Sequence, residues 1–88
     1  MFEWDEAKRL RVLAERGVDF LDAIKMFDGR PVRHLLSRRA AEDRFASTAV
    51  FNGKFYTVVW MWRDGNQRII TLRRARHGEE RAYRQIFG

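Results

Sequence analysis

Two dipeptides near the middle of the chain, Asn52-Gly53 and Asp64-Gly65, restrict the possible fold more than any other feature of the sequence. Asn-Gly and Asp-Gly accept the positive φ angles that two-residue hairpin turns require. Both dipeptides lie between segments in which apolar and polar side chains alternate, as they do along a strand with one buried face. The sequence therefore predicts three consecutive antiparallel strands, at about 45–51, 55–62 and 67–73.

The two turns also predict how the strands pair. A two-residue turn at the first dipeptide places Val50 opposite Phe55, and a two- or four-residue loop at the second places Ile70 opposite Val59. One face of the sheet is then apolar, and we expect helices to cover it: Ala46, Val50, Phe55, Val59, Met61, Ile70 and Leu72. The other face is aromatic and polar: Phe45, Ser47, Ala49, Tyr56, Val58, Trp60, Trp62, Ile69, Thr71 and Arg73.

Helical patterns precede and follow these strands. Asp5 and Asp19 are suited to cap helices at about 5–16 and 19–28, and Gly17 lies where a helix C-terminus favours glycine. Residues 78–87 predict a third helix. The side chains expected on the predicted helix faces are Ala7, Leu10, Leu13 and Ala14, then Phe20, Ala23, Ile24 and Phe27, then Glu79, Ala82, Tyr83 and Ile86.

The remaining segments complete the fold prediction. Residues 2–4 and 32–36 are expected to form short strands, and residues 37–43 a loop or a helical turn. The expected fold class is α+β, with two N-terminal helices packed on an antiparallel sheet of about four strands and a C-terminal helix. We expect residues 1–88 to form a single domain, because this length supports one compact core.

Composition excludes several classes of protein. The chain has no cysteine, so it has neither a disulfide framework nor a thiolate metal site. No apolar run reaches the roughly 20 residues that a membrane-spanning helix needs, and the N-terminus does not have the pattern of a signal peptide. We therefore expect a soluble cytoplasmic protein that does not bind membranes.

The charge is distributed unevenly. The chain has 18 Lys and Arg against 12 Asp and Glu, a net charge of +6. Residues 1–28 have five basic and seven acidic groups, whereas residues 29–88 have thirteen and five. Most of the cations are arginine, whose planar guanidinium binds phosphate through two hydrogen bonds. The expected partner is a nucleic acid, and the alternative is a solvated basic surface.

Aromatic and basic side chains suggest how a nucleic acid would bind. Bases stack on exposed aromatic rings, and arginines bind the backbone phosphates. Two alternatives remain open. Trp60 is equally compatible with burial beneath the C-terminal helix or a partner, and Glu80 and Arg84 are compatible with an ordinary surface ion pair. The expected nucleic-acid-binding residues are Tyr56, Trp60, Arg63, Arg68, Arg74 and Arg76.

A metal-independent reaction on RNA is compatible with these residues. The two histidines, His34 and His77, lie far apart in the sequence, and we expect neither a metal nor another cofactor. The ribose 2′-OH can attack the adjacent phosphate if a base, stabilising cations and an acid are present. The candidate bases are Glu42, Glu80, His77 and Lys8, the lysine only if its pKa is lowered. The candidate acids are Tyr83 and His77.

Five short motifs occur in order along nearly the whole chain: F-E-W-D-x-x-K at 2–8, G-V-x-F at 17–20, E-D-R at 42–44, R-I-I-T-x-R-R-A at 68–75 and E-R-x-Y at 80–83. Together they resemble the BrnT family, which are toxins of type II toxin–antitoxin systems. The resemblance implies a RelE-like ribonuclease fold and RNA cleavage that inhibits translation. It also implies neutralisation by a BrnA-type antitoxin with a ribbon-helix-helix part, in a heterotetramer that contacts DNA only through the antitoxin.

The resemblance also implies functional residues. Trp4 and Asp5 fall on its N-terminal motif, where we favour structural roles. This chain has Val12 where the family commonly has Asn, and Arg16 where it commonly has His, so the proton-transfer groups remain open. The family's polar motif positions are Lys8, Arg44, Arg68, Arg73, Arg74, Glu80, Arg81 and Tyr83. Of these, the expected catalytic residues are Lys8, Arg44, Arg73, Glu80, Arg81 and Tyr83.

Two other functions remain compatible with the sequence. A nucleic-acid-binding module without catalytic activity would explain the charge and the aromatic residues equally well, and its binding would depend steeply on salt. A subunit whose basic face is covered by an acidic protein partner would bind RNA weakly and that partner tightly.

Overall fold

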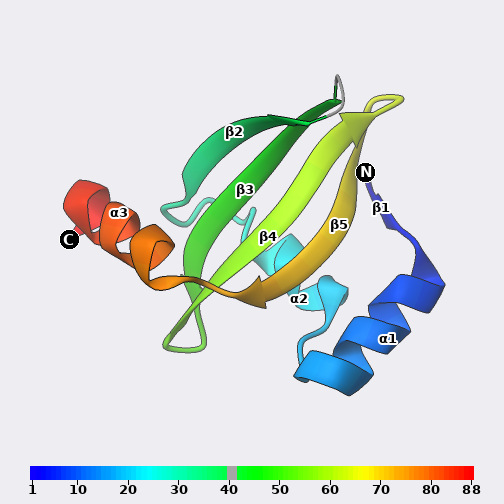
Figure 1. The fold of residues 1–88 in the computed structure, drawn as a ribbon, viewed down its shortest axis with the longest axis horizontal. Helices are drawn as coiled ribbons and strands as arrows, with labels where there is room; N and C mark the ends of the chain where they lie inside the picture. The colour runs from blue at the N-terminus through cyan, green and yellow to red at the C-terminus, as the bar shows by residue number, and fades with distance from the viewer. Residues whose placement is uncertain (40–41) are drawn as a thin grey trace.

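The computed structural model describes residues 1–39 and 42–88. Within them the chain forms one five-stranded sheet and three helices (Figure 1). The sheet order is β1-β5-β4-β3-β2; β1 is parallel to β5 and the other neighbouring strands are antiparallel. In chain order the elements are β1 (Phe2–Trp4), α1 (Glu6–Arg16), α2 (Phe20–Lys25), β2 (Arg33–Arg39), β3 (Glu42–Phe51), β4 (Lys54–Arg63), β5 (Asn66–Arg74) and α3 (His77–Phe87).

The α+β class and the C-terminal helix are confirmed, but the sheet is larger than predicted. The short strand β1 joins it in parallel with β5, so the sheet is mixed rather than antiparallel. The prediction of a loop or helical turn at 37–43 is wrong for the described residues. There β2 continues through Ser37 to Arg39 and β3 begins at Glu42, because the two strands pair along this length. Residues 40–41 of that prediction lie outside the described residues.

The helix caps agree with the sequence. The Asp5 side chain accepts a hydrogen bond from the Lys8 N–H at 3.2 Å, and the Asp19 side chain accepts one from the Leu21 N–H at 3.0 Å. Gly17 ends α1 with φ at 71°. The second helix is shorter than predicted and ends at Lys25. Phe27, beyond that end, packs on the Trp60 ring at 5.4 Å between centroids.

The first hairpin has the predicted register throughout, whereas the second has it only between its turn and the pair Trp60–Ile69. Val50 lies opposite Phe55, as expected. In the second hairpin Val59 pairs with Thr71 and Trp60 pairs with Ile69, so Ile70 forms a bulge between them. An extra residue in one strand reverses the faces of all side chains beyond it. Leu72 therefore shares a face with Val58 and not with Val59.

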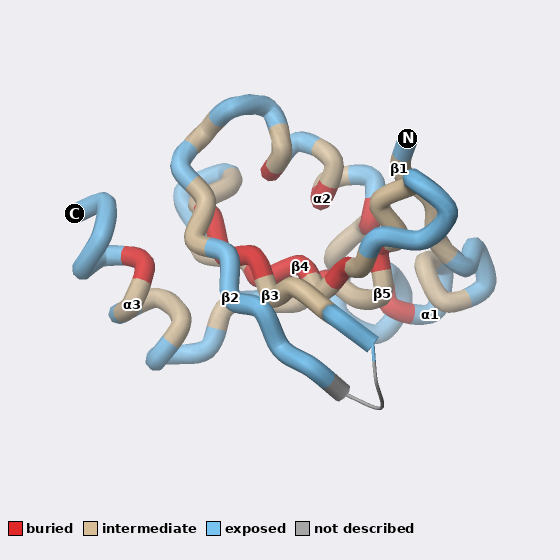
Figure 2. Tube along the Cα trace, turned by 90° about the horizontal axis from the view of Figure 1, so that it is seen from above, coloured by how far each residue is buried: buried red, intermediate tan, exposed pale blue. Residues whose placement is uncertain are grey.

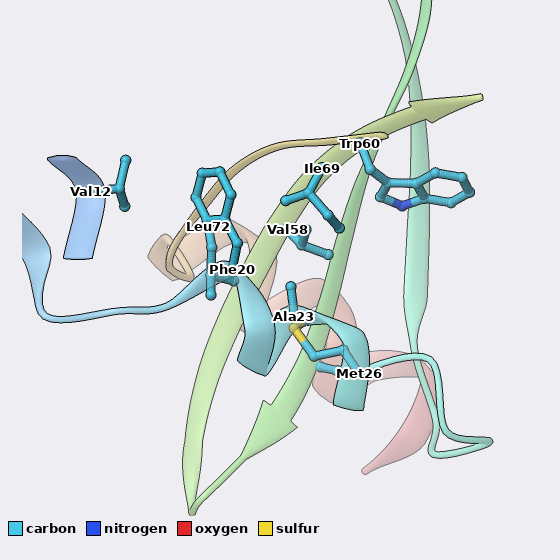
Figure 3. Close-up of a cluster of buried hydrophobic side chains, with 9 residues drawn as sticks. Val12, Phe20, Ala23, Met26, Val58, Trp60, Ile69 and Leu72 are labelled. Carbon is cyan, nitrogen blue, oxygen red and sulfur yellow. The ribbon is translucent and has the colours of Figure 1, made fainter. Parts of the chain in front are cut away.

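The prediction of which sheet face is covered by the N-terminal helices is wrong as a consequence. Phe20 of α2 and Met26, which directly follows α2, pack on the face that was predicted to be aromatic and polar, where Val58 and Trp60 lie (Figure 3). Both faces have apolar side chains, so alternation alone could not identify the covered one. The buried cluster is Val12, Phe20, Ala23, Met26, Ala49, Val58, Trp60, Ile69 and Leu72.

Helix α1 lies beside the end of the sheet formed by β5 and β1 and contacts β5, whereas α2 lies over one face (Figure 2). From this position α1 buries Val12 and leaves Leu10 and Leu13 exposed, so the predicted apolar stripe of α1 is wrong. The same position lets other side chains of α1 reach the opposite face of the sheet. Helix α3 contacts β2 and β3 at one end of that face, where Tyr83 packs on Phe55.

Candidate functional site

A hollow of about 510 Å³, which we call the central hollow, lies on the sheet face opposite α2. Its floor is formed by β3, β4 and β5, with Ala46, Val59 and Thr71 on neighbouring strands. Cations from α1, β3 and β5 surround this floor. The full lining is Lys8, Arg16, Leu35, Ser37, Arg44, Phe45, Ala46, Val59, Ile70, Thr71, Arg73, Arg76 and Glu79.

A second hollow of about 580 Å³, the flanking hollow, adjoins the first. The two share Lys8, Arg44 and Ile70. The flanking hollow extends toward β1 and adds Arg63 and Arg68 to the cations. Its other lining residues are Asp5, Glu42, Met61 and Ile69. Together the two hollows form a basic surface that is continuous through Lys8 and Arg44.

Lys8 lies where the two hollows meet. Burial of its ammonium group lowers the pKa of Lys8 below the ordinary value of 10.5. The nearby guanidinium groups of Arg11, Arg44 and Arg16 lower this pKa further, because each disfavours another positive charge. The neutral amine is therefore more accessible at Lys8 than at a solvated lysine. This meets the condition under which the sequence made Lys8 a candidate base.

Arg16 projects from the last turn of α1 onto β5. Its Nη1 donates hydrogen bonds to Thr71 Oγ1 at 3.2 Å and to the Leu72 carbonyl at 3.3 Å. Both acceptors are neutral, so they hold the side chain in place without neutralising its charge. Arg16 therefore brings a cation to the central hollow.

Arg73, which also lines the central hollow, forms a bidentate ion pair with Glu79. The two Nη–Oε distances are 2.7 and 2.9 Å. The Glu79 carboxylate also accepts hydrogen bonds from Thr57 Oγ1 at 3.1 Å and from the Arg76 N–H at 2.8 Å. Burial alone would raise the pKa of Glu79, but these hydrogen bonds and the charge of Arg73 outweigh it and lower the pKa to about 2.

The other arginines of the two hollows are held less firmly. Arg44 pairs with Glu42, two residues earlier on the same strand, at 3.1 Å. Arg68 of β5 pairs with Glu3 of β1 at 2.7 Å, and this ion pair helps to join the two strands. Arg63 and Arg76 are exposed. The structure thus brings Lys8, Arg44 and Arg73 together with Arg63, Arg68 and Arg76, as a single basic surface.

Three predicted catalytic residues do not line either hollow. Glu80 pairs with Arg84 at 3.2 Å across one turn of α3, which is the surface ion pair left open by the sequence. Arg81 is exposed on the same helix. Tyr83 is only 8% exposed and packs between Phe55 and Phe87.

Three predicted nucleic-acid-binding residues lie on the face that α2 covers. Trp60 is 5% exposed and donates a hydrogen bond from Nε1 to Ser47 Oγ at 2.8 Å, so its ring belongs to the core and not to an exposed platform for bases. Tyr56 is half-buried, and the guanidinium of Arg74 lies 5.6 Å from its ring centroid. The stacking surface expected from the aromatic residues is therefore mostly occupied by the protein itself.

Two residues of the central hollow were missed by the sequence reasoning as functional groups. Arg16 lies eight residues after Lys8, about two helical turns, so the spacing could have placed both cations on one side of α1. Glu79 occupies the third position of α3, where a glutamate reaches back to the helix N-terminus. That signal could have separated Glu79 from Glu80, but it does not indicate the contact with Arg73.

The described part of the chain has no cluster of carboxylates and histidines that could form a metal site. Over residues 1–39 and 42–88, no group of three or more His, Asp and Glu side chains is arranged to hold a metal ion. His34 contacts Ser47 Oγ through Nδ1 at 2.6 Å on the face covered by α2. In the same residue ranges, no helix is long and apolar enough to cross a membrane.

The fold and the site define a class of protein: a small α+β domain with a basic hollow that contains a lysine of lowered pKa. A family model described as "Ribonuclease toxin, BrnT, of type II toxin-antitoxin system" matches residues 4–79. The chain therefore belongs to the BrnT family of ribonuclease toxins. Family membership implies RNA as the substrate and an antitoxin as the partner. No curated protein matches the chain.

Proposed function

We propose that this protein is an endoribonuclease that cleaves RNA without a metal ion, in the central hollow, with Lys8 as the general base. The observation that carries the proposal is the position of Lys8. Its amine has a pKa lowered by burial and by neighbouring arginines that include Arg44 and Arg16, and Lys8 lines both hollows, the central one together with Arg73. A base near the 2′-OH and cations around the phosphate are the groups that this reaction requires.

The proposed reaction is an intramolecular transesterification. The neutral Lys8 amine removes the proton of a ribose 2′-OH, and the 2′-oxygen forms a bond to the adjacent phosphorus. The bond from phosphorus to the 5′-oxygen then breaks, and the leaving oxygen takes a proton from water. The products are a 2′,3′-cyclic phosphate and a 5′-OH. The Lys8 ammonium returns its proton to solvent, so neither electrons nor a cofactor are consumed.

The arginines would stabilise the charge that develops on the phosphate. Guanidinium groups remain protonated, so they serve as hydrogen-bond donors and not as proton-transfer groups. Arg16 and Arg73 both line the central hollow, and Arg44 lines both hollows. Losing one such donor typically costs about 10²–10³-fold in rate, and losing a general base costs about 10²–10⁴-fold. Arg63 and Arg68 would bind the RNA backbone along the flanking hollow.

The biological setting is also part of the proposal, and membership of the BrnT family supports it. We assign the chain to the RelE-like ribonucleases, with residues 1–88 acting as a single toxin domain in the cytoplasm. Cleavage would inhibit translation. A BrnA-type antitoxin with a ribbon-helix-helix part would neutralise the toxin in a heterotetramer, and the complex would bind DNA through the antitoxin.

The experiment that tests the proposal is incubation of the purified protein with a defined RNA in EDTA, with and without ribosomes, followed by end-group analysis. We expect fragments with 2′,3′-cyclic phosphate ends from the wild type and much slower cleavage by Lys8→Arg and Arg73→Ala. Arg84→Gln is the matched control, because it removes a cation that pairs with Glu80 outside the hollows.

Each possible result decides something different. Cleavage that needs added divalent metal would refute the metal-independent mechanism. Equal rates for Lys8→Arg and the wild type would remove Lys8 from the role of base. Intact RNA under both conditions, with tight and salt-dependent RNA binding, would favour a binding module without catalytic activity.

A further inference from the structure

The hydrogen bonds of Arg73 leave one edge of its guanidinium unoccupied. A guanidinium has five N–H donors: one on Nε and two on each Nη. Nη1 donates to Glu79 Oε1 at 2.7 Å and to the Arg74 carbonyl at 3.4 Å, so both of its hydrogens have acceptors. Nη2 donates one hydrogen to Glu79 Oε2 at 2.9 Å. Within residues 1–39 and 42–88, Nε and the second Nη2 hydrogen have no acceptor.

These two remaining hydrogens lie side by side. Nη2 is the terminal nitrogen on the same side of the guanidinium as the Nε hydrogen, so both N–H bonds point outward from a single edge. Two parallel donors of this kind match two oxygens of a phosphate group. Because Arg73 lines the central hollow beside Thr71 and Arg76, this edge is available to a phosphate bound there.

Glu79 is itself firmly held. Its Oε1 accepts hydrogen bonds from Thr57 Oγ1 and from the Arg76 N–H, at the start of α3. Thr57 is fully buried and lies 2.8 Å from Thr48 Oγ1, which can donate to it from the neighbouring strand. The carboxylate is thus tied both to the sheet and to the helix. A guanidinium paired to it in two places has little freedom to rotate.

We propose that Glu79 is a positioning residue, which fixes the Arg73 guanidinium so that its Nε–Nη2 edge binds the RNA phosphate in the central hollow. This inference rests on the function proposed above. Glu79 acts through Arg73 and does not take the substrate proton. Consistent with this role, the pKa of Glu79 is lowered to about 2, which makes its carboxylate a weak base at neutral pH.

Glu79→Gln is the principal test. The amide is close in shape to the carboxylate and keeps one oxygen as an acceptor, but its NH₂ group cannot accept from Arg73 Nη2. We expect kcat for RNA cleavage to fall about tenfold to a hundredfold, since small misplacements of a catalytic group have effects of this size. We expect this variant to bind 2′-O-methyl RNA, which lacks the attacking hydroxyl, at least as tightly as the wild type does. The reason is that the substitution removes a negative charge from the basic hollow.

A double-mutant cycle separates positioning from an independent contribution of Glu79. In an Arg73→Ala background, Glu79→Gln should have little further effect on kcat, because the group that it positions is absent. Equal fold-losses in the two backgrounds would overturn the inference. A fall in thermal stability with kcat unchanged would also overturn it, since this is the result expected if Glu79 only secures the start of α3.

A second variant covers the case in which Glu79→Gln does not fold. Thr57→Val keeps the shape of a buried side chain and removes one hydrogen bond to Glu79. It should lower kcat by up to about tenfold, again only when Arg73 is present. A Thr57→Val protein that is folded and cleaves at the wild-type rate would count against the coupling between Glu79 and the site.

A spectroscopic measurement keeps the inference distinguishable from the proposed function. The Arg73 Nε–H resonance can be assigned by its loss in Arg73→Lys. It should shift when 2′-O-methyl RNA is added to the wild type, and shift much less in Glu79→Gln. This readout does not require cleavage. A wild type that cleaves no RNA but shows the shift would refute the proposed ribonuclease and leave the positioned phosphate site. A wild type that cleaves RNA but shows no shift of the Arg73 resonance would refute the positioned phosphate site and leave the proposed ribonuclease.

Discussion

The ion pair between Arg73 and Glu79 should make the stability of the protein depend on pH in a defined window. The folded protein holds the pKa of Glu79 at about 2, whereas the ordinary value is 4.5. A carboxyl group whose pKa is lowered by folding stabilises the protein above its unfolded pKa, and this stabilisation is lost as the pH falls through the folded value. The contribution of Glu79 should therefore be complete above about pH 5 and absent near pH 2.

The size of the effect follows from the shift. A shift of about 2.5 pKa units corresponds to about 3 kcal/mol of unfolding free energy, at 1.36 kcal/mol per unit. The Arg73 and Glu79 side chains remain 20% and 16% exposed, so solvent screens the pair and we expect ~1–2 kcal/mol. In a domain of this size, that difference lowers the unfolding temperature by roughly 5–15 °C.

Urea or thermal unfolding of the wild type and Glu79→Gln at several pH values between 7 and 2 measures this contribution. The variant should be less stable at pH 7, and the two proteins should converge as the pH approaches 2. Asp28 also has a pKa of about 2, held there by Arg30, but it is present in both proteins and cancels in the difference. A stability difference that stays constant across this range would refute the reasoning, because it would show that the charge of Glu79 does not stabilise the fold.

Three further predictions concern the catalytic groups. Lys8→Arg keeps the positive charge but cannot supply a neutral amine, so cleavage should fall about 10²–10⁴-fold and the rise of rate with pH should disappear; a pH–rate profile measures both. Arg44→Gln removes a neighbouring cation and should raise the pKa of Lys8 toward its ordinary value, so the ascending limb of the same profile should move to higher pH, and an unmoved limb would contradict the assignment of Lys8. Tyr83→Phe keeps the ring that packs on Phe55 and should cleave within about twofold of the wild type, whereas a loss of two orders of magnitude would restore the tyrosine as a catalytic acid.

The local elements of the fold could be predicted from the sequence because short-range chemistry determines them. Asn52 and Asp64 adopt φ angles of 51°, each followed by a glycine with positive φ, as the two predicted turns require. Asp5 and Asp19 cap the helices that their positions indicated. These features depend on residues only a few positions apart, so neither the sheet nor the core is needed to recognise them.

The order of the sheet could be predicted only in part. The first hairpin register follows from its turn, since both strands are joined by two residues. The bulge at Ile70 does not follow from the turn at Asp64-Gly65, because the two strands pair regularly for several residues before it. The parallel pairing of β1 with β5 joins segments that lie far apart in the sequence. Contacts between such distant segments leave no pattern among neighbouring residues.

For the site, the sequence identified the kinds of residue and some of their positions. The motifs marked Lys8, Arg44 and Arg73, which the structure brings to adjoining hollows. They also marked Glu80 and Tyr83, which the rotation of α3 directs elsewhere, to Arg84 and Phe55. Adjacent helical positions differ by about 100° in direction, so the choice between Glu79 and Glu80 depends on how the helix is docked.

The sequence by itself determined the capped helices, the two hairpins, the excess of arginine and the family. Only the tertiary structure decided which sheet face the N-terminal helices cover, and so which face bears the hollows. Each strand has apolar side chains on both faces, and a single bulged residue exchanges the faces of everything beyond it. The covered face is the one on which α2 packs against Val58 and Trp60. These residues lie more than thirty positions from α2 in the sequence, so no local pattern indicates the contact.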